Sequence, residues 1–515
     1  MTAPFSRLLT ALLVFVLVGA ASARDAFGLF PFSPSEFRDA DKLRTACSAP
    51  AAAAFFCADL EQELTRVPTK GVDLFFSEAG EVVAAFAKVQ KGQSLSTYQV
   101  ENRDNLVPYD QAIPAGALLL DGVYHEPTGL TSSWVQVDPV TLRGGFRYLL
   151  AGLEVEVDVV VSDVVQTLTY DIRVRTAAGG GAEAVAPPRT VQFVVAGIGR
   201  QDSPTIKVGQ ASAFTLNPLT VPVDGATYVS LQTNNRNRDN AIILTPGLGL
   251  GSAGDPLQGI SLGDRRVAMQ VPFDGQARLT VGLYLGKNEL VRFYQEGYDA
   301  LPGLFSPNIL GRMSLWVLIA LDFIYAYVNN WALSIIVLTL LFRVLVWPLI
   351  TTQTRSMFGM QQLQPQLQKL QKKYKDDREK LTQETMKLYK EAGVNPAGGC
   401  LPILLQMPLF IILWRVFVNF EFNEGFLWIP DLGLPDPWYI LPALYVMVML
   451  AMSWFSAKGN PTMLRQSVLI NLVFVFIMVG FPAGVLLYFV VSMSVQVFQY
   501  WLLSRNQPAP AAAKA

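Results

Sequence analysis

The chain has 515 residues, of which 51% are hydrophobic and 16% are charged, whereas soluble domains carry roughly 25% charged residues. A formal net charge of −1, one histidine and three cysteines give no support for a nucleic-acid-binding protein, a histidine-rich metal site or a Ser-His-Asp triad. No phosphate-binding loop motif is present, so the sequence gives no sign of ATP or another cofactor. The apolar excess lies at the N-terminus and after residue 310, which indicates a soluble middle region joined to a membrane-embedded part.

Residues 1–23 have the pattern of a secretory signal peptide. Arg7 precedes an apolar run over residues 8–20, and Ala21-Ser22-Ala23 supplies small residues for cleavage. The alternative is an uncleaved first transmembrane helix. Both interpretations predict that the chain from residue 24 lies outside the cytoplasm. In that oxidising compartment Cys47 and Cys57 either form a disulfide or remain two buried thiols.

Residues 24–310 are expected to form an extracytoplasmic all-β domain. Runs of β-branched and aromatic residues, several alternating with polar residues, predict strands over residues 72–76, 145–150, 154–161, 167–175, 190–195 and 277–284. Clusters of glycine and proline separate these runs. Many short strands with turns between them favour a β-sandwich, and we find no catalytic constellation in this region.

A short apolar segment follows the β domain. Its most apolar part, residues 315–328, is too short to cross a bilayer comfortably and contains Asp322 and two tyrosines. These features favour an amphipathic helix in the outer membrane interface over residues 311–330. The alternative, an extension of the next span, is disfavoured by Asn329-Asn330.

Residues 331–350 are apolar except for one charge, Arg343. As a helix they would be about 30 Å long, the thickness of the hydrocarbon core of a bilayer. An arginine near the bilayer centre costs about 2.5–3.5 kcal/mol. Arg343 therefore either snorkels to the interface or faces a wet cavity inside a helix bundle. The second interpretation gives the residue a function.

The polar segment 351–398 holds nine basic and five acidic residues. Leu363, Leu367 and Leu370 follow the spacing of a helical seam, and Asp376-Asp377 interrupts it. We therefore predict a hairpin of two antiparallel helices. The alternative is a solvated, charged linker.

Four further apolar segments predict transmembrane helices over residues 401–420, 438–455, 468–481 and 484–503. The link between the first two holds four acidic residues and no basic one, whereas the link between the second and third holds two basic residues and no acidic one. The positive-inside rule therefore places residues 351–398 and the tail 504–515 in the cytoplasm. The predicted fold is a membrane α-helical bundle of five core transmembrane helices, with an extracytoplasmic β-sandwich and a cytoplasmic helical hairpin.

Several motifs in the predicted membrane part resemble those of the YidC family of membrane protein insertases. They are LSIIVLTLLFR before Pro348-Leu349, NPAGGCLPILLQMPLF at 395–410, IPDLGLPDPWYILP at 429–442 and FPAGVLLYFVVS at 481–492. Long matches in the same order are far more specific than one motif. The resemblance covers residues 310–503. The large domain before the first core span resembles the Gram-negative type of the family by position and strand character.

The resemblance implies an insertase and chaperone, not an enzyme, that works without ATP, metal or catalytic residues. Its clients would enter a hydrophilic groove that is open to the cytoplasm and to lipid but closed outside. The groove arginine of the family corresponds to Arg343, and a polar groove position corresponds to Thr339. Positions that touch the client helix correspond to Leu404, Met407, Phe410 and Phe489. Phe489 stands where some members have tyrosine.

The implied location is the bacterial inner membrane, and the implied partners are nascent integral membrane proteins and the lipid bilayer. A Sec translocon and the ribosome are partners that the sequence leaves open. Members of the family that hold the ribosome use a long basic tail, whereas the tail NQPAPAAAKA is short and nearly uncharged. The cleavable-looking N-terminus and the pair Cys47 and Cys57 also depart from the family pattern. The alternative functions are a membrane transporter or channel, and an assembly scaffold acting beside a Sec translocon.

Overall fold

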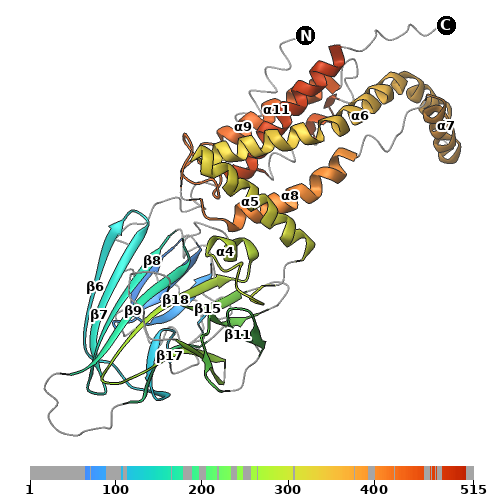
Figure 1. The fold of residues 1–515 in the computed structure, drawn as a ribbon. Helices are drawn as coiled ribbons and strands as arrows, with labels where there is room; N and C mark the ends of the chain where they lie inside the picture. The colour runs from blue at the N-terminus through green and yellow to red at the C-terminus, as the bar shows by residue number, and fades with distance from the viewer. Residues whose placement is uncertain are drawn as a thin grey trace. The chain divides into compact units, whose positions relative to one another are not determined.

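The computed structural model of the chain divides into two compact units (Figure 1). The β-rich unit comprises Ser22–Ile309 and Asn419–Glu421, and the helical unit comprises Met1–Ala21, Leu310–Val418 and Phe422–Ala515. The structure describes residues 64–69, 71–87, 106–107, 113–163, 165–177, 188–196, 204–216, 220–233, 240–247, 257–263, 265–305, 308–375, 377–392, 401–422, 424–456, 464–465, 467–469, 471 and 478–505. The predicted segment 1–23 and the predicted disulfide of Cys47 and Cys57 lie outside these residues.

The β-rich unit is built on a nine-stranded antiparallel sheet. In spatial order its strands are β12 (Phe214–Leu216), β11 (Thr205–Gly209), β14 (Tyr228–Gln232), β15 (Asn240–Pro246), β18 (Gln276–Lys287), β9 (Thr167–Thr176), β8 (Leu153–Ser162), β7 (Thr141–Leu150) and β6 (Thr128–Asp138). The turn between β7 and β8 is Ala151-Gly152, whose φ angles of 49° and 83° are those of a tight hairpin turn. This turn fixes the register of the two long strands.

Two smaller sheets complete the β-rich unit. The six-stranded sheet has the order β13 (Val223–Asp224), β16 (Gln258–Gly263), β17 (Arg266–Pro272), β10 (Thr190–Ala196), β4 (Ala117–Leu120) and β5 (Val123–Tyr124). The three-stranded sheet contains β1 (Thr65–Pro68), β2 (Val72–Phe76) and β3 (Val82–Ala87). The short helix α4 (Leu290–Gln295) follows the last strand.

All three sheets contribute to one hydrophobic core, which contains Phe76, Phe146 and Phe193 from β2, β7 and β10. Strand β8 shows why the sequence folds this way. Val155 and Val157 are buried, whereas Glu154, which precedes Val155 and points to the opposite face, is exposed. Two large sheets that share a core are expected of a β-sandwich. The six predicted strands are confirmed as parts of β2, β7, β8, β9, β10 and β18.

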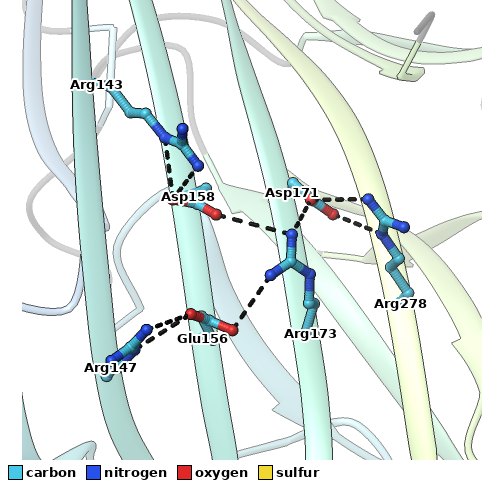
Figure 2. A network of polar contacts seen from close by, with 7 residues as sticks. All are labelled: Arg143, Arg147, Glu156, Asp158, Asp171, Arg173 and Arg278. Carbon is cyan, nitrogen blue, oxygen red and sulfur yellow. Dashed lines mark hydrogen bonds and ion pairs between the residues drawn. The ribbon is translucent and has the colours of Figure 1, made fainter. Parts of the chain in front are cut away.

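The face of the nine-stranded sheet opposite this core carries a network of charged side chains (Figure 2). Arg173 on β9 lies 2.8 Å from Asp171 and 3.3 Å from Glu156. The remaining members come from β7, β8 and β18, and are Arg143, Arg147, Asp158 and Arg278. Opposite charges therefore alternate across four neighbouring strands on this solvated face.

The helical unit contains α5 (Ile309–Val328), α6 (Trp331–Lys373), α7 (Arg378–Glu391), α8 (Leu401–Asn419), α9 (Ile440–Ser456) and α11 (Ala483–Arg505). Three described helices are long and apolar enough to cross a bilayer: α5, the part of α6 over Trp331–Ser356, and α11. Two shorter apolar helices are Gln406–Asn419 and Ile440–Phe455. Half of the predicted span 468–481 lies outside the described residues.

Two helices differ from their predicted bounds. α6 continues through residue 350, where we expected the span to end, and its 43 residues give a helix about 65 Å long, roughly twice the hydrocarbon thickness. It ends at Lys373, just before the predicted interruption. α5 begins at Ile309, before the apolar run over residues 315–328, and is 20 residues long.

α5 carries two apolar faces. Gly311, Leu318 and Leu321 are buried within the unit. Trp316, Phe323 and Tyr327, which lie on the other side of the helix, are between 64% and 76% exposed. An exposed face of large apolar side chains suits a lipid environment. The location of α5 in the outer membrane interface stays a prediction.

Candidate functional site

The site begins with Arg343, whose residue is only 6% exposed. Its Nε donates a hydrogen bond to the Oγ of Ser492 on α11 at 2.7 Å, and its Nη2 donates to the same oxygen. The guanidinium therefore faces the neighbouring helix and does not extend along α6 to the interface. In the part of the chain that the structure describes, no carboxylate forms an ion pair with it. The charge is buried and hydrogen-bonded, but it is not neutralised.

Further polar side chains extend the site along α11. Tyr488 precedes Ser492 by one helical turn, so the two residues lie on the same face of the helix. The hydroxyl of Tyr488 accepts a hydrogen bond of 2.8 Å from the Nε2 of Gln406 on α8. Three helices thus contribute polar groups to one region inside an apolar bundle. Such groups are costly in lipid unless they are paired or wet, and they mark functional regions.

Thr339 lies one turn before Arg343 and is 3% exposed. Its Oγ1 donates to the carbonyl oxygen of Ile335 at 2.6 Å, so its polar atom is satisfied within its own helix. Thr339 lines a cavity together with Phe342 of the same helix and Tyr488 of α11, and the other lining residues are apolar. The cavity holds about 80 Å³ of space for water-sized molecules. The helices therefore leave room beside the polar region.

The predicted client-contacting residues fall into two groups. Phe410 on α8 and Phe489 on α11 lie in contact, with ring centroids 5.9 Å apart, and Tyr445 of α9 packs on Phe489. Met407 is 51% exposed. Leu404 belongs to α8, but its side chain is outside the described part. The structure thus brings Phe410 and Phe489 together into an aromatic wall and leaves Met407 on the surface of the bundle.

Comparison with known proteins identifies the family. The family model described as "60Kd inner membrane protein" matches residues 323–510. The "Membrane protein insertase YidC" of Deinococcus radiodurans is 35% identical over 373 residues, which cover 70% of this chain and 82% of that protein. The chain belongs to the YidC family of membrane protein insertases. The YidC protein of Haemophilus ducreyi is 41% identical over 202 residues, 38% of this chain and 37% of that protein.

A solved structure supports the same fold. The chain superposes on "Active YidC insertase crystal structure with the first transmembrane domain resolved" with a TM-score of 0.55, over 86% of this chain and 93% of that chain. Their sequences are 18% identical, so this likeness concerns the fold. The predicted family is confirmed, and the large β-rich unit with apolar helices is a YidC-like fold. YidC proteins are inner membrane proteins that insert other proteins and are not enzymes.

Sequence reasoning found Arg343 but missed Ser492, its hydrogen-bond partner, and Gln406, which bonds Tyr488. Both are polar residues inside otherwise apolar segments, and that was the available signal. It is a weak one, because a serine or threonine in a helix commonly bonds a carbonyl of its own preceding turn, as Thr339 and Ser494 do. Only the fold shows that Ser492 faces a charge on another helix.

Proposed function

We propose that this chain inserts membrane proteins through a polar groove that is centred on Arg343 and open to the cytoplasm and to lipid. The helical unit would contain five core spans, with the predicted segment 468–481 supplying the one that the described residues cover only in part. The part of α6 beyond the bilayer and α7 would form a cytoplasmic helical hairpin. α7 supports this placement, because none of its described residues is buried and it is rich in charge.

The observation that carries the proposal is the buried, unneutralised guanidinium of Arg343. A buried charge whose partner is a neutral hydroxyl is not neutralised, so it still attracts an anion. An acidic residue in the polar flank of an incoming client would complete this interaction and leave again as the client moves on. The neighbouring cavity, which Thr339 and Tyr488 help to line, is space that the helices leave unfilled beside this region.

The energetics need no ATP. An apolar client helix gains about 0.3–0.6 kcal/mol for each Leu, Ile, Phe or Val that enters lipid. Its charged flank opposes the transfer at about 2.5–3.5 kcal/mol for each charge at the bilayer centre. A groove that reaches part of the way across shortens the apolar path of the flank. Met407, Phe410 and Phe489, with Leu404, would then guide the apolar helix from the groove into lipid.

The same proposal orients the chain. Residues 24–310 and 421–437 would lie in the periplasm, and residues 351–398 and the tail 504–515 in the cytoplasm, as the distribution of charge favours. Residues 1–23 would be a signal peptide or a first transmembrane helix. Nascent membrane proteins are the clients. A Sec translocon would be a partner at the same membrane.

Crosslinking tests the groove directly. Photoreactive side chains at positions 410 and 489 of the full chain, in inner membrane vesicles, are expected to label the apolar helix of a ribosome-stalled membrane protein. Trp454 on α9 is 52% exposed and serves as the control position, because it belongs to none of the predicted contacts. Equal labelling from all three positions, or none from 410 and 489, would reject the proposed groove.

A further inference from the structure

A second buried polar side chain on α6, that of Gln353, takes no part in the site described above. Gln353 is 3% exposed, and neither its Oε1 nor its Nε2 has a hydrogen-bond partner among the described residues. Buried amides are nearly always paired, because an unpaired one forfeits its hydrogen bonds to water without replacement. Such an amide needs a partner from outside the chain, such as water or another polar molecule.

The other polar side chains of this region are satisfied. The Oγ1 of Thr354 donates to the carbonyl oxygen of Ile350 at 2.8 Å. The Oγ1 of Thr351 donates to the carbonyl oxygen of Trp347 at 2.9 Å and accepts from the Nε2 of Gln499 on α11 at 2.9 Å. Among these three buried or half-buried side chains, the unpaired amide is therefore specific to Gln353.

Helix geometry places Gln353 on the side of α6 that also carries the site. At 3.6 residues per turn, Gln353 lies about 40° around the helix from Thr339 and about 80° from Arg343. Thr339 and Phe342 line the cavity together with residues of α5, α8 and α11, so this is the side of α6 that faces the cavity. Along the axis, Gln353 lies about 15 Å beyond Arg343. The two residues are thus successive polar positions on one side of one helix.

We propose that Gln353 is a second client contact, which binds peptide groups in the extended polar flank of an incoming membrane protein. A primary amide offers both donors and an acceptor, which match the C=O and N–H of an extended chain whatever its sequence. An extended chain covers about 3.3 Å per residue, so about five residues span the distance between Arg343 and Gln353. This inference rests on the proposed function of the groove, and it adds a dependence on flank length.

The test uses the purified full chain in proteoliposomes and two clients with the same apolar helix. One client carries about two flank residues beyond an acidic residue, and the other carries about eight, enough to reach Gln353. Gln353→Leu is expected to slow insertion of the long-flank client about two- to tenfold, the range for one ordinary hydrogen bond, and to leave the short-flank client unchanged. Thr354→Val is the matched control, because Thr354 bonds its own helix, and it should affect neither client.

Several outcomes separate the possible roles. Leucine has a similar volume and no polar atom to leave unpaired, so the variant should melt at or above the parent temperature. Equal slowing of both clients, or of neither, would overturn the proposal. A photoreactive side chain at position 353 gives a second readout and should label the flank of the long-flank client alone. Arg343→Ala separates the two roles. If this variant has no effect on insertion while Gln353→Leu still slows only the long-flank client, the role of Arg343 is rejected and that of Gln353 is kept.

Discussion

The Nε of Arg343 lies 2.7 Å from the Oγ of Ser492, and both residues are buried. The two residues are 149 positions apart in the chain, so the contact joins α6 to α11 as well as orienting the guanidinium. A hydroxyl oxygen accepts hydrogen bonds from arginine but leaves its charge unneutralised. The pair therefore holds a positive charge in a fixed direction inside an apolar bundle.

Removal of the Ser492 hydroxyl should destabilise the helical unit. Ser492→Ala leaves a buried cation without its described acceptor, and hydrogen bonds to charged groups contribute about 1.5–3 kcal/mol. Ser494→Ala is the matched control, because Ser494 is exposed and bonds the carbonyl of Val490 in its own helix. Thermal unfolding of both variants in detergent measures the difference. Equal melting temperatures would show that the Arg343 contact contributes nothing.

The β-rich unit should lose stability between about pH 4.5 and pH 7 because of Glu81. Burial raises the pKa of its carboxyl to about 7, although Ser77 and Tyr124 hydrogen-bond to it. The folded state therefore binds a proton that the unfolded state releases at a lower pH. The contribution of Glu81 is complete below the ordinary pKa of glutamate and is lost as the pH rises through 7. The total is about 3 kcal/mol.

Glu81→Gln provides the control, because an amide stays neutral at every pH. The stability gained on this substitution should be larger at pH 8 than at pH 4.5 by about the same 3 kcal/mol. The stability of the β-rich unit is measured by urea unfolding of the full chain in detergent. Pulsed deuterium labelling of peptides from β8 reports the fraction of this unit that is unfolded. A difference between variant and parent that is constant with pH would contradict the assignment.

A buried ion pair in the β-rich unit should be sensitive to loss of either partner. Arg292 of α4 pairs with Glu421, and their side chains are 5% and 1% exposed. Arg292→Met leaves a buried carboxylate without its cation, for which about 3–5 kcal/mol of destabilisation is expected. The double variant Arg292→Met and Glu421→Leu should recover part of this loss, because it buries no charge. Additive losses in urea unfolding would contradict the pairing.

The exposed network of Figure 2 should behave differently. Arg173 contacts Asp171 and Glu156, but its side chain is 33% exposed. Arg173→Ala should therefore lower the free energy of unfolding by less than about 1 kcal/mol, and the effect should shrink in molar salt. A larger loss that salt does not change would show that the network supports the sheet in another way.

The strands of the β-rich unit could be predicted because one face of each is buried and the other is solvated. Strand β8 buries every second residue, and this alternation is visible in the sequence itself. The order of the nine strands could not be predicted. β9 pairs with β18 as well as with β8, and the pairing of β9 with β18 joins residues about a hundred positions apart in the chain.

Arg343 could be found from the sequence because a single charge in an apolar span is costly and therefore conspicuous. Its environment could not, since Ser492 is an ordinary residue for a helix until α11 is packed on α6. Gln353 lies beyond the predicted end of the span at residue 350, so it was counted with the polar hairpin. The continuous helix moves it into the buried part of the bundle.

The most direct test of the central claim compares two clients that differ by one charge. In proteoliposomes, the Arg343→Ala chain inserts a client whose flank carries an aspartate or, in the matched client, an asparagine at the same position. Loss of the guanidinium should slow the aspartate client about tenfold or more and leave the asparagine client unchanged. Arg343→Lys should restore part of the rate, because it keeps the charge without the planar fork. Equal insertion of both clients by the Arg343→Ala chain would contradict a groove that works by holding an acidic flank.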